Sequence, residues 1–330
     1  MTGAGAAMDR NLALEAVRVT EAAALAASRM TGRGDERVAD QAAITAMRTA
    51  LDCLSIAGTV VIGEGAREDA PMLYIGEKVG CGKGPAIDVA LDPLEGSTIC
   101  AKGGQNACAV VAIAEPGGFL SVPDSYMEKL AIGAGLPPGI VDLDQSPEEN
   151  LRALAKAKHA DISDLLICIL DRPRHDDLIA KVREAGARIM LIADGDVSGV
   201  IAAALPHTGV DMYWGTGGAP EGVLAAAALR CLGGQMQGRL LLRSDDEKQR
   251  AKRAGITDPR HKYDLTEMAR GNVMFAATGV TDGAMLRGVH RSPGAAVTHS
   301  MVMRSTTGTL RYIEAHHNLD RKPDCGGKGR

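Results

Sequence analysis

The chain has 330 residues, which suggests about two domains and a substantial buried core. Apolar residues make up 45% of the sequence but aromatic residues only 2%, so the core must be filled by Ala, Val, Leu, Ile and Met, and stacking on nucleobases is not expected. The 37 basic and 41 acidic side chains give a net charge of −4, which argues against a general nucleic-acid or membrane surface.

The first half of the chain is predicted to mix helices with a sheet. Residues 11–30 and 38–55 carry apolar side chains at helical spacing and are predicted to be helices. Strands are predicted at 59–62, 86–91 and 107–114.

In the second half, helices and strands are predicted to alternate. Ser146, Pro147 and Glu149 form an N-terminal capping pattern that predicts a helix up to about Lys158. Beyond residue 160 the alternation implies a parallel, layered α/β region. The predicted strands are 165–170, 187–193, 210–214, 239–243, 272–278 and 296–303, and the predicted helices are 175–185, 197–204 and 220–231.

The run Asp92-Pro93-Leu94-Glu95-Gly96-Ser97 carries the strongest chemical signal. It places two carboxylates three residues apart directly after an apolar strand and ends in a hydroxyl beside a glycine. The proline fixes the backbone between the acids, and Gly96 allows the chain to approach a ligand closely. Carboxylate oxygens at such a turn suit a divalent metal site that meets a phosphate. An ordinary strand-to-helix turn with solvated acids is the alternative.

Other acids also lie at the ends of predicted elements. Glu64 stands between two glycines after a strand, and Glu221 begins a helix after the glycine-rich run 215–222, whereas Asp40 lies within a helix. Strand ends are where ligand crevices form in layered α/β proteins. The run 215–222 completes neither a dinucleotide fingerprint nor a Walker loop, although its N–H groups favour an anion. Taken alone, Glu64 is explained as a turn residue and Glu221 by the helix dipole.

In this order, these motifs resemble the class II fructose-1,6-bisphosphatases of the lithium-sensitive sugar and inositol phosphatase superfamily. The resemblance covers nearly the whole chain. It rests on Gly32–Asp35, Val61–Gly65, Ala70–Gly80, Asp92–Ser97, Pro123–Leu130, Pro173–Asp176, Asp194–Asp196 and Gly217–Gly222.

The resemblance implies a mixed α/β, layered α-β-α-β-α sugar phosphatase fold that assembles as a homodimer or homotetramer. The implied activity is gluconeogenic hydrolysis of the 1-phosphate of fructose 1,6-bisphosphate by metal-activated water, giving fructose 6-phosphate and phosphate. Sedoheptulose 1,7-bisphosphate is a second substrate of some relatives. We expect an α+β domain at 1–160 with most metal ligands, and an α/β domain at 161–330 with the sugar-phosphate contacts and Glu221.

Residue roles carried over from the resemblance form three groups. The expected ligands of Mg²⁺ or Mn²⁺ are Asp40, Glu64, Asp92, Glu95 and Glu221. The expected catalytic residues are Asp40, Ser97 and Glu64. Ser97 is expected to be hydrogen-bonded to Asp40 and to orient the water. The expected substrate contacts are Glu95, Gly96, Ser97, Tyr126, Arg172, Pro173, Arg174, Asp194, Gly195, Asp196 and Gly218. The arginines suit the second phosphate and the two aspartates the sugar hydroxyls.

Four positions depart from the family pattern. Ser97 stands where the family usually has threonine, and Glu36 where many relatives have lysine, which reverses a charge near Asp40. Arg172 replaces a common lysine and Glu68 a common aspartate, so both keep their charge.

Two alternatives remain open from the sequence. One is a phosphatase of the same superfamily that acts on inositol monophosphate or a phosphonucleotide, and the other is a non-catalytic sugar-phosphate sensor. His316 and His317 are adjacent, so in a strand they would point to opposite faces and make a poor metal pair. Seven cysteines without a C-x-x-C pair, and the absence of an apolar run of the ~20 residues that span a bilayer, predict a cytoplasmic protein.

Overall fold

A computed structural model describes residues 8, 11–66 and 70–321 of the chain. Backbone contacts divide it into two compact units. The first unit comprises Met1–Phe119 and Arg270–Arg330, and the second comprises Leu120–Ala269. The second unit is therefore inserted into the first, and the boundary expected at residue 160 falls inside the second unit.

The first unit is built on an eight-stranded mixed sheet. Its strand order is β12-β13-β11-β4-β3-β1-β2, and β14 pairs with β13. The strands are β1 (Ala57–Ile62), β2 (Lys78–Val79), β3 (Ala86–Glu95), β4 (Cys108–Ala114), β11 (Val273–Gly279), β12 (His290–Ser292), β13 (Ala295–Arg304) and β14 (Thr309–Asn318). The central strand β4 is buried at every position, because it lies between β3 and β11.

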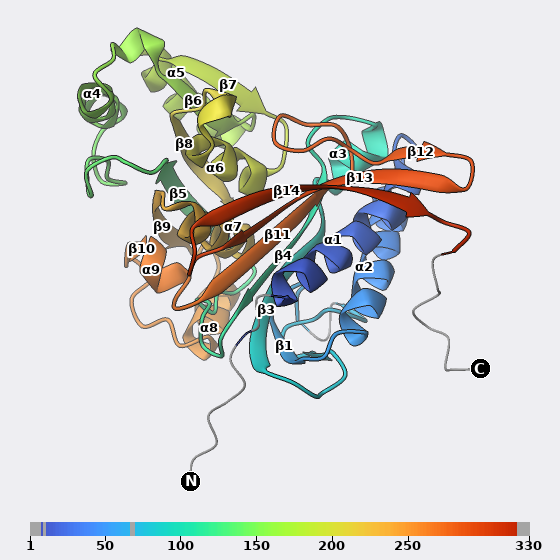
Figure 1. The fold of residues 1–330 in the computed structure, drawn as a ribbon. Coiled ribbons are helices and arrows are strands. Elements are labelled where there is room, and N and C mark those ends of the chain that lie inside the picture. The colour runs from blue at the N-terminus through green and yellow to red at the C-terminus, as the bar shows by residue number, and fades with distance from the viewer. Residues whose placement is uncertain (1–7, 9–10, 67–69, 322–330) are drawn as a thin grey trace. The chain divides into compact units, whose positions relative to one another are not determined.

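Two long helices, α1 (Leu12–Ala27) and α2 (Glu36–Asp52), lie side by side against this sheet (Figure 1). A 3₁₀ turn, η1 (Ser28–Met30), follows α1. Asp35 caps α2 by accepting a hydrogen bond from the Val38 N–H at 3.0 Å, which satisfies one of the free donors at the helix start. The short helix α3 (Ser97–Lys102) follows β3. Alanine, valine and methionine side chains of α1 and α2 pack with the sheet in one core, as the composition predicts.

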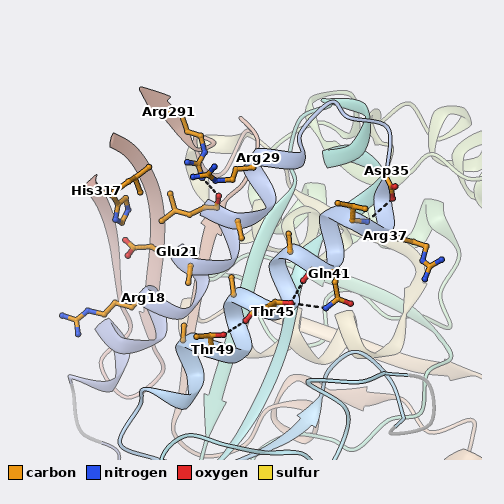
Figure 2. A pocket seen from close by; sticks show the side chains of 18 residues that line it. Arg18, Glu21, Arg29, Asp35, Arg37, Gln41, Thr45, Thr49, Arg291 and His317 are labelled. Carbon is orange, nitrogen blue, oxygen red and sulfur yellow. Dashed lines mark hydrogen bonds between the residues drawn. The ribbon is translucent and has the colours of Figure 1, made fainter. Parts of the chain in front are cut away.

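A groove of about 1340 Å³ runs along the outer faces of α1 and α2 (Figure 2). Alanines of both helices are among the residues that line it, and Arg29 and Arg291 lie at one end (Figure 2). None of the residues expected in the active site lines this groove.

The second unit contains a six-stranded mixed sheet in the order β10-β9-β5-β8-β6-β7. The strands are β5 (Tyr126–Ile132), β6 (Leu166–Leu170), β7 (Arg188–Ile192), β8 (Met212–Gly218), β9 (Gln235–Leu241) and β10 (Tyr263–Asp264). Strand β6 is parallel to both β7 and β8, as the alternation predicted. The sheet is not parallel throughout, because β5 runs antiparallel to both β8 and β9.

Helices of the second unit pack on this sheet. Helices α4 and α5 bury their apolar side chains in one cluster with Ile167 and Ile169 of β6, whereas α6 and α7 pack against each other and contact β8 and β5. The helices are α4 (Pro147–Lys158), α5 (Asp176–Glu184), α6 (Asp196–Ala204), α7 (Ala219–Leu232), α8 (Asp245–Arg253) and α9 (Leu265–Met268), with 3₁₀ turns η2 (Ile162–Asp164), η3 (Pro173–His175) and η4 (Pro206–Thr208).

The two units confirm the mixed α/β prediction. Helix α4 begins at Pro147 with the expected capping box at Ser146 and Glu149 and ends at Lys158. In β14, His316 is exposed while His317 is buried, as expected for neighbours on opposite faces of a strand. Strands β2, β5, β10, β12 and β14 and helices α3, α8 and α9 were not predicted from the sequence. Glu68 lies outside the described residues, and no described helix is long and apolar enough to cross a membrane.

Candidate active site

The acidic motif of the first unit lies where β3 meets α3. The sequence predicted that this strand ends at Leu91, but β3 continues through Glu95. Its register against β4 shifts between Asp92 and Glu95. Asp92 Oδ1 accepts a hydrogen bond from the Leu94 N–H at 3.0 Å, which fixes the turn between the two acids. Gly96 has φ of 84°, a left-handed conformation that favours glycine, and α3 begins at Ser97.

Glu64 lies at the same edge of this sheet as the Asp92 motif. Strands β1 and β3 are parallel, and Ile62 is paired with Ala90. Glu64 and Asp92 each stand two residues beyond this pair, so the sheet register brings the two acids to one level. The Glu64 N–H donates to the Leu73 carbonyl at 3.0 Å, and a Cβ at Gly63 would lie 2.1 Å from that same oxygen. The glycine before Glu64 is thus required by packing as well as by any ligand.

Asp40 lies in the second turn of α2, close to α3. The Gly32 and Gly34 N–H groups donate to the carbonyls of Cys100 and Ala101 at 2.9 Å, which ties the turn before α2 to α3. Burial, and secondarily the charge of Glu36, raises the pKa of Asp40 to about 6. The charge reversal at Glu36 therefore acts on Asp40, as the sequence suggested.

Two cysteine thiols lie next to these acids. Cys108 Sγ–H donates to Glu95 Oε2 at 3.4 Å, and burial followed by the charge of Glu95 raises the pKa of Cys108 well above its usual value. Burial also raises the pKa of Cys100, with a smaller contribution from Asp40. Nothing in the local sequence of either cysteine indicates a carboxylate neighbour, so these contacts could not be predicted from the sequence.

The oxygen ligands of this region fit a hard divalent cation, but the side chains do not form a complete coordination sphere. Carboxylates supply the oxygen ligands that Mg²⁺ and Mn²⁺ prefer, and Glu95 is only 4% exposed. Within residues 11–66 and 70–321, no three His, Cys, Asp or Glu side chains converge as a metal-binding group. Over the same residues, no hydrogen bond joins Ser97 to Asp40.

The residues expected to contact substrate in the second unit meet at one edge of its sheet. Tyr126 at the start of β5 is paired with Gly218 at the end of β8. Arg174 donates from Nε to the Thr216 carbonyl at 2.8 Å, and its Cζ lies 5.1 Å from the centroid of the Tyr126 ring. Arg172 Nη2 lies 3.9 Å from Asp194 Oδ1, at the outer limit of an ion pair.

A buried histidine holds the arginine segment in place. The Thr216 N–H donates to His175 Nε2 at 2.7 Å, so the ring carries its proton on Nδ1 and donates it to the Leu170 carbonyl at 2.8 Å. Burial, together with the neighbouring guanidinium charges, lowers the pKa of His175. The neutral ring therefore joins the Arg172–Arg174 turn to the end of β8. Sequence reasoning had assigned no histidine a role in the site.

A buried charge network lies beneath the glycine-rich turn. Lys129 is fully buried; its ammonium pairs with Asp196 and donates to the Gly218 carbonyl at 2.7 Å. Glu221 Oε2 is inaccessible and has no hydrogen-bond partner. Burial, and then the charge of Asp196, raises the pKa of Glu221 to about 7, against the opposing effect of Lys129. An orphaned carboxylate oxygen of this kind fits a cation ligand.

Consecutive glycines make room for these acids. A Cβ at Gly217 would lie 1.9 Å from Asp196 Oδ2, and one at Gly218 would lie 1.8 Å from Glu221 Oε2. Residues 217 and 218 must therefore lack side chains for Asp196 and Glu221 to occupy their positions.

Comparison with known proteins identifies the family. The family model described as bacterial fructose-1,6-bisphosphatase, glpX-encoded, matches residues 10–317. Proteins named fructose-1,6-bisphosphatase 1 class 2 from Escherichia coli K12 and fructose-1,6-bisphosphatase class 2 from Shigella flexneri are each 46% identical to this chain over 329 residues, covering 96% of the chain and 97% of the relative. The chain, with its acidic strand end in one unit and its arginine-bearing sheet edge in the other, belongs to the class II bacterial fructose-1,6-bisphosphatase family.

Proposed function

We propose that this protein hydrolyses the 1-phosphate of fructose 1,6-bisphosphate, giving fructose 6-phosphate and phosphate in gluconeogenesis. The observation that carries the proposal is the family match over residues 10–317, within which every carboxylate and arginine expected from the motifs is present. A sensor that had lost catalysis is disfavoured, because such a protein is expected to lack some of these carboxylates.

The proposed metal ligands are Asp40, Glu64, Asp92, Glu95 and Glu221, for Mg²⁺ or Mn²⁺. Raised pKa values at Asp40 and Glu221 support the assignment, because a cation would relieve the cost of ionising these carboxyls. The chemistry supplied by divalent cations in such sites is activation of water and neutralisation of charge on the transferring phosphoryl group.

The chain's own residues would then handle the proton and the sugar. Hydrolysis breaks the bond between phosphorus and the C1 oxygen and forms one between phosphorus and a water oxygen. The Asp40 carboxylate would accept a proton of that water, the Ser97 hydroxyl would orient it, and the C1 oxygen would take up a proton and leave as a hydroxyl group of fructose 6-phosphate. Asp194, which is partly exposed, would accept hydrogen bonds from sugar hydroxyls, while Asp196 is held by Lys129.

The arginines favour a sugar that bears two phosphates over inositol monophosphate. Arg172 and Arg174 stand at the sheet edge with Tyr126, where a planar guanidinium can bind phosphate bidentately. A substrate with only one phosphate would leave this positive charge without a partner. Homodimeric or homotetrameric assembly and a cytoplasmic location are part of the proposal, and size-exclusion chromatography with light scattering tests the first.

The deciding assay measures phosphate release from fructose 1,6-bisphosphate, sedoheptulose 1,7-bisphosphate and inositol 1-phosphate, each with Mg²⁺, Mn²⁺ or EDTA. Metal-dependent release from the first is expected, and release from inositol 1-phosphate alone would overturn the substrate assignment. Asp92→Asn and Glu221→Gln should abolish most turnover without unfolding the chain. Glu184→Gln, an exposed change at the end of α5, serves as the control.

A further inference from the structure

Three guanidinium groups, not two, gather at the substrate edge of the second unit. Arg243 stands two residues beyond the end of β9, and its Cζ lies 4.3 Å from the centroid of the Tyr126 ring. Arg174 Cζ lies 5.1 Å from the same centroid. One aromatic ring therefore holds two cations from segments about 70 residues apart in sequence.

The sheet register explains why Arg243 reaches this place. Tyr126 is paired with Gly218 on one side and with Leu241 of β9 on the other. The end of β9 therefore lies beside the start of β5, and the next residues of the chain continue past the Tyr126 ring. The segment Arg172–Arg174 lies beside the end of β8, where Arg174 Nε donates a hydrogen bond to the Thr216 carbonyl, and Arg174 reaches the same ring from there.

The backbone at Arg243 is fixed on both sides. It lies two residues after the end of β9 and directly before Ser244, the N-cap of α8, which forms a capping box with Glu247. Glu247 Oε2 accepts hydrogen bonds from the N–H groups of both Arg243 and Ser244. The backbone at Arg243 is therefore already ordered before a ligand binds, which lowers the entropic cost of binding.

The charge at this edge is only partly offset within the unit, because Arg243 acts through its charge on the Glu247 carboxylate but is not paired with it. Among the described residues, neither Arg243 nor Arg174 forms an ion pair with a carboxylate, and Arg172 reaches Asp194 only at 3.9 Å. The Tyr126 ring brings two like charges together, and a bound anion would reduce the repulsion between them. Guanidinium groups around a phosphate relieve this repulsion through charge-assisted, bidentate hydrogen bonds.

We propose that Arg243, together with Arg172 and Arg174, binds the phosphate that is not cleaved. The Tyr126 ring, over which the guanidinium groups of Arg174 and Arg243 lie, positions these two side chains. The inference rests on the proposed function for the identity of the substrate. It adds a substrate-specificity residue that the motif resemblance did not include. Arg243 acts on binding of the second phosphate and takes no part in breaking the first phosphoester.

The first test is binding of fructose 6-phosphate, which carries only the phosphate that remains, measured by titration calorimetry with EDTA present. Arg243→Ala should weaken binding about 10- to 100-fold, the range expected for loss of hydrogen bonds to a charged group. Arg253→Ala removes the same charge from the exposed end of α8 and should leave the affinity unchanged. Unchanged affinity in Arg243→Ala, or no binding by the wild-type protein, would overturn the inference.

The second test separates KM from kcat. For fructose 1,6-bisphosphate, Arg243→Ala should raise KM by a similar factor with little change in kcat, whereas turnover of fructose 1-phosphate should be unaffected. Tyr126→Ala removes the ring over which Arg174 and Arg243 lie and should resemble Arg243→Ala. Equal losses on both substrates would contradict a role at the second phosphate.

The two tests also separate this inference from the proposed function. A wild-type protein that fails to hydrolyse fructose 1,6-bisphosphate but binds fructose 6-phosphate through Arg243 would remove the proposed function and support the phosphate site. If the wild-type protein hydrolyses fructose 1,6-bisphosphate normally and Arg243→Ala changes neither binding nor KM, the proposed function would stand and the phosphate site at Arg243 would be wrong.

Discussion

Glu221→Gln should stabilise the metal-free protein at alkaline pH although it abolishes activity. The carboxyl is buried, its Oε2 has no hydrogen-bond partner, and its pKa is raised from 4.5 to about 7. The folded state therefore binds more protons than the unfolded state between these values, and its stability falls as pH rises through them. Glutamine has the same shape without the charge, so its stability does not carry this loss.

The size of the effect follows from the pKa. Each pKa unit is worth about 1.4 kcal/mol, so the ionised Glu221 costs the folded state on the order of 3 kcal/mol at pH 8. The advantage of Glu221→Gln should thus be about 3 kcal/mol larger at pH 8 than near pH 4.5, where the wild-type carboxyl is protonated in the folded protein. A bound cation should remove the advantage by stabilising the wild-type carboxylate.

Trp214 provides the assay. It is the only tryptophan in the chain and lies in β8, in the same unit as Glu221, so its fluorescence reports unfolding of that unit. Urea unfolding would be followed at both pH values in EDTA, with Glu184→Gln as the exposed control. A stability difference between Glu221→Gln and wild type that does not change with pH would refute the reasoning.

Three further changes have defined outcomes. Glu36→Lys replaces a charge that raises the pKa of Asp40 with one that lowers it, and the new positive charge also repels a cation at every pH, so calorimetry should show a smaller loss of Mn²⁺ affinity at pH 6 than at pH 8; an equal loss at both would contradict this. Ser97→Ala should reduce kcat about 10²-fold through a misoriented water, whereas Ser97→Thr, whose β-branched side chain has fewer rotamers, should retain or exceed wild-type kcat; steady-state kinetics of both variants decide. His175→Ala leaves the Thr216 N–H without its acceptor, so Trp214 fluorescence should show a loss of about 1–3 kcal/mol, and an unchanged urea midpoint would show that the ring bond is dispensable.

Local signals in the sequence predicted the elements that are determined locally. Helix α4 was predicted from its first residue to its last, because Ser146, Pro147 and Glu149 satisfy the helix start without help from the rest of the fold. Strand β5 was missed, because the charged residues Glu128 and Lys129 interrupt its apolar pattern. Lys129 is buried there only because Asp196, 67 residues away, pairs with it. No local pattern contains that partner.

In the candidate site too, the features set by local sequence could be predicted and those set by long-range contacts could not. Placement of Glu64 and the Asp92 motif at adjacent strand ends was predictable from apolar runs that stop at glycine or proline. The neighbours that tune the site were not, since Cys108, His175 and Arg243 reach it through strand register and long-range hydrogen bonds. Strand β14 could not be predicted either, because an edge strand with many polar residues resembles a loop in sequence.

The insertion of the second unit into the first sets an order for biosynthesis. Strand β4 needs β11 as its partner, but 158 residues separate the end of β4 from the start of β11, so the ribosome must first complete Leu120–Ala269. Until then, the wholly apolar β4 has an open edge that invites pairing with other chains. The inserted unit is contiguous and has its own core, so it can fold while the first sheet waits. A nascent chain stalled before residue 270 is therefore the form of this protein most in need of a chaperone.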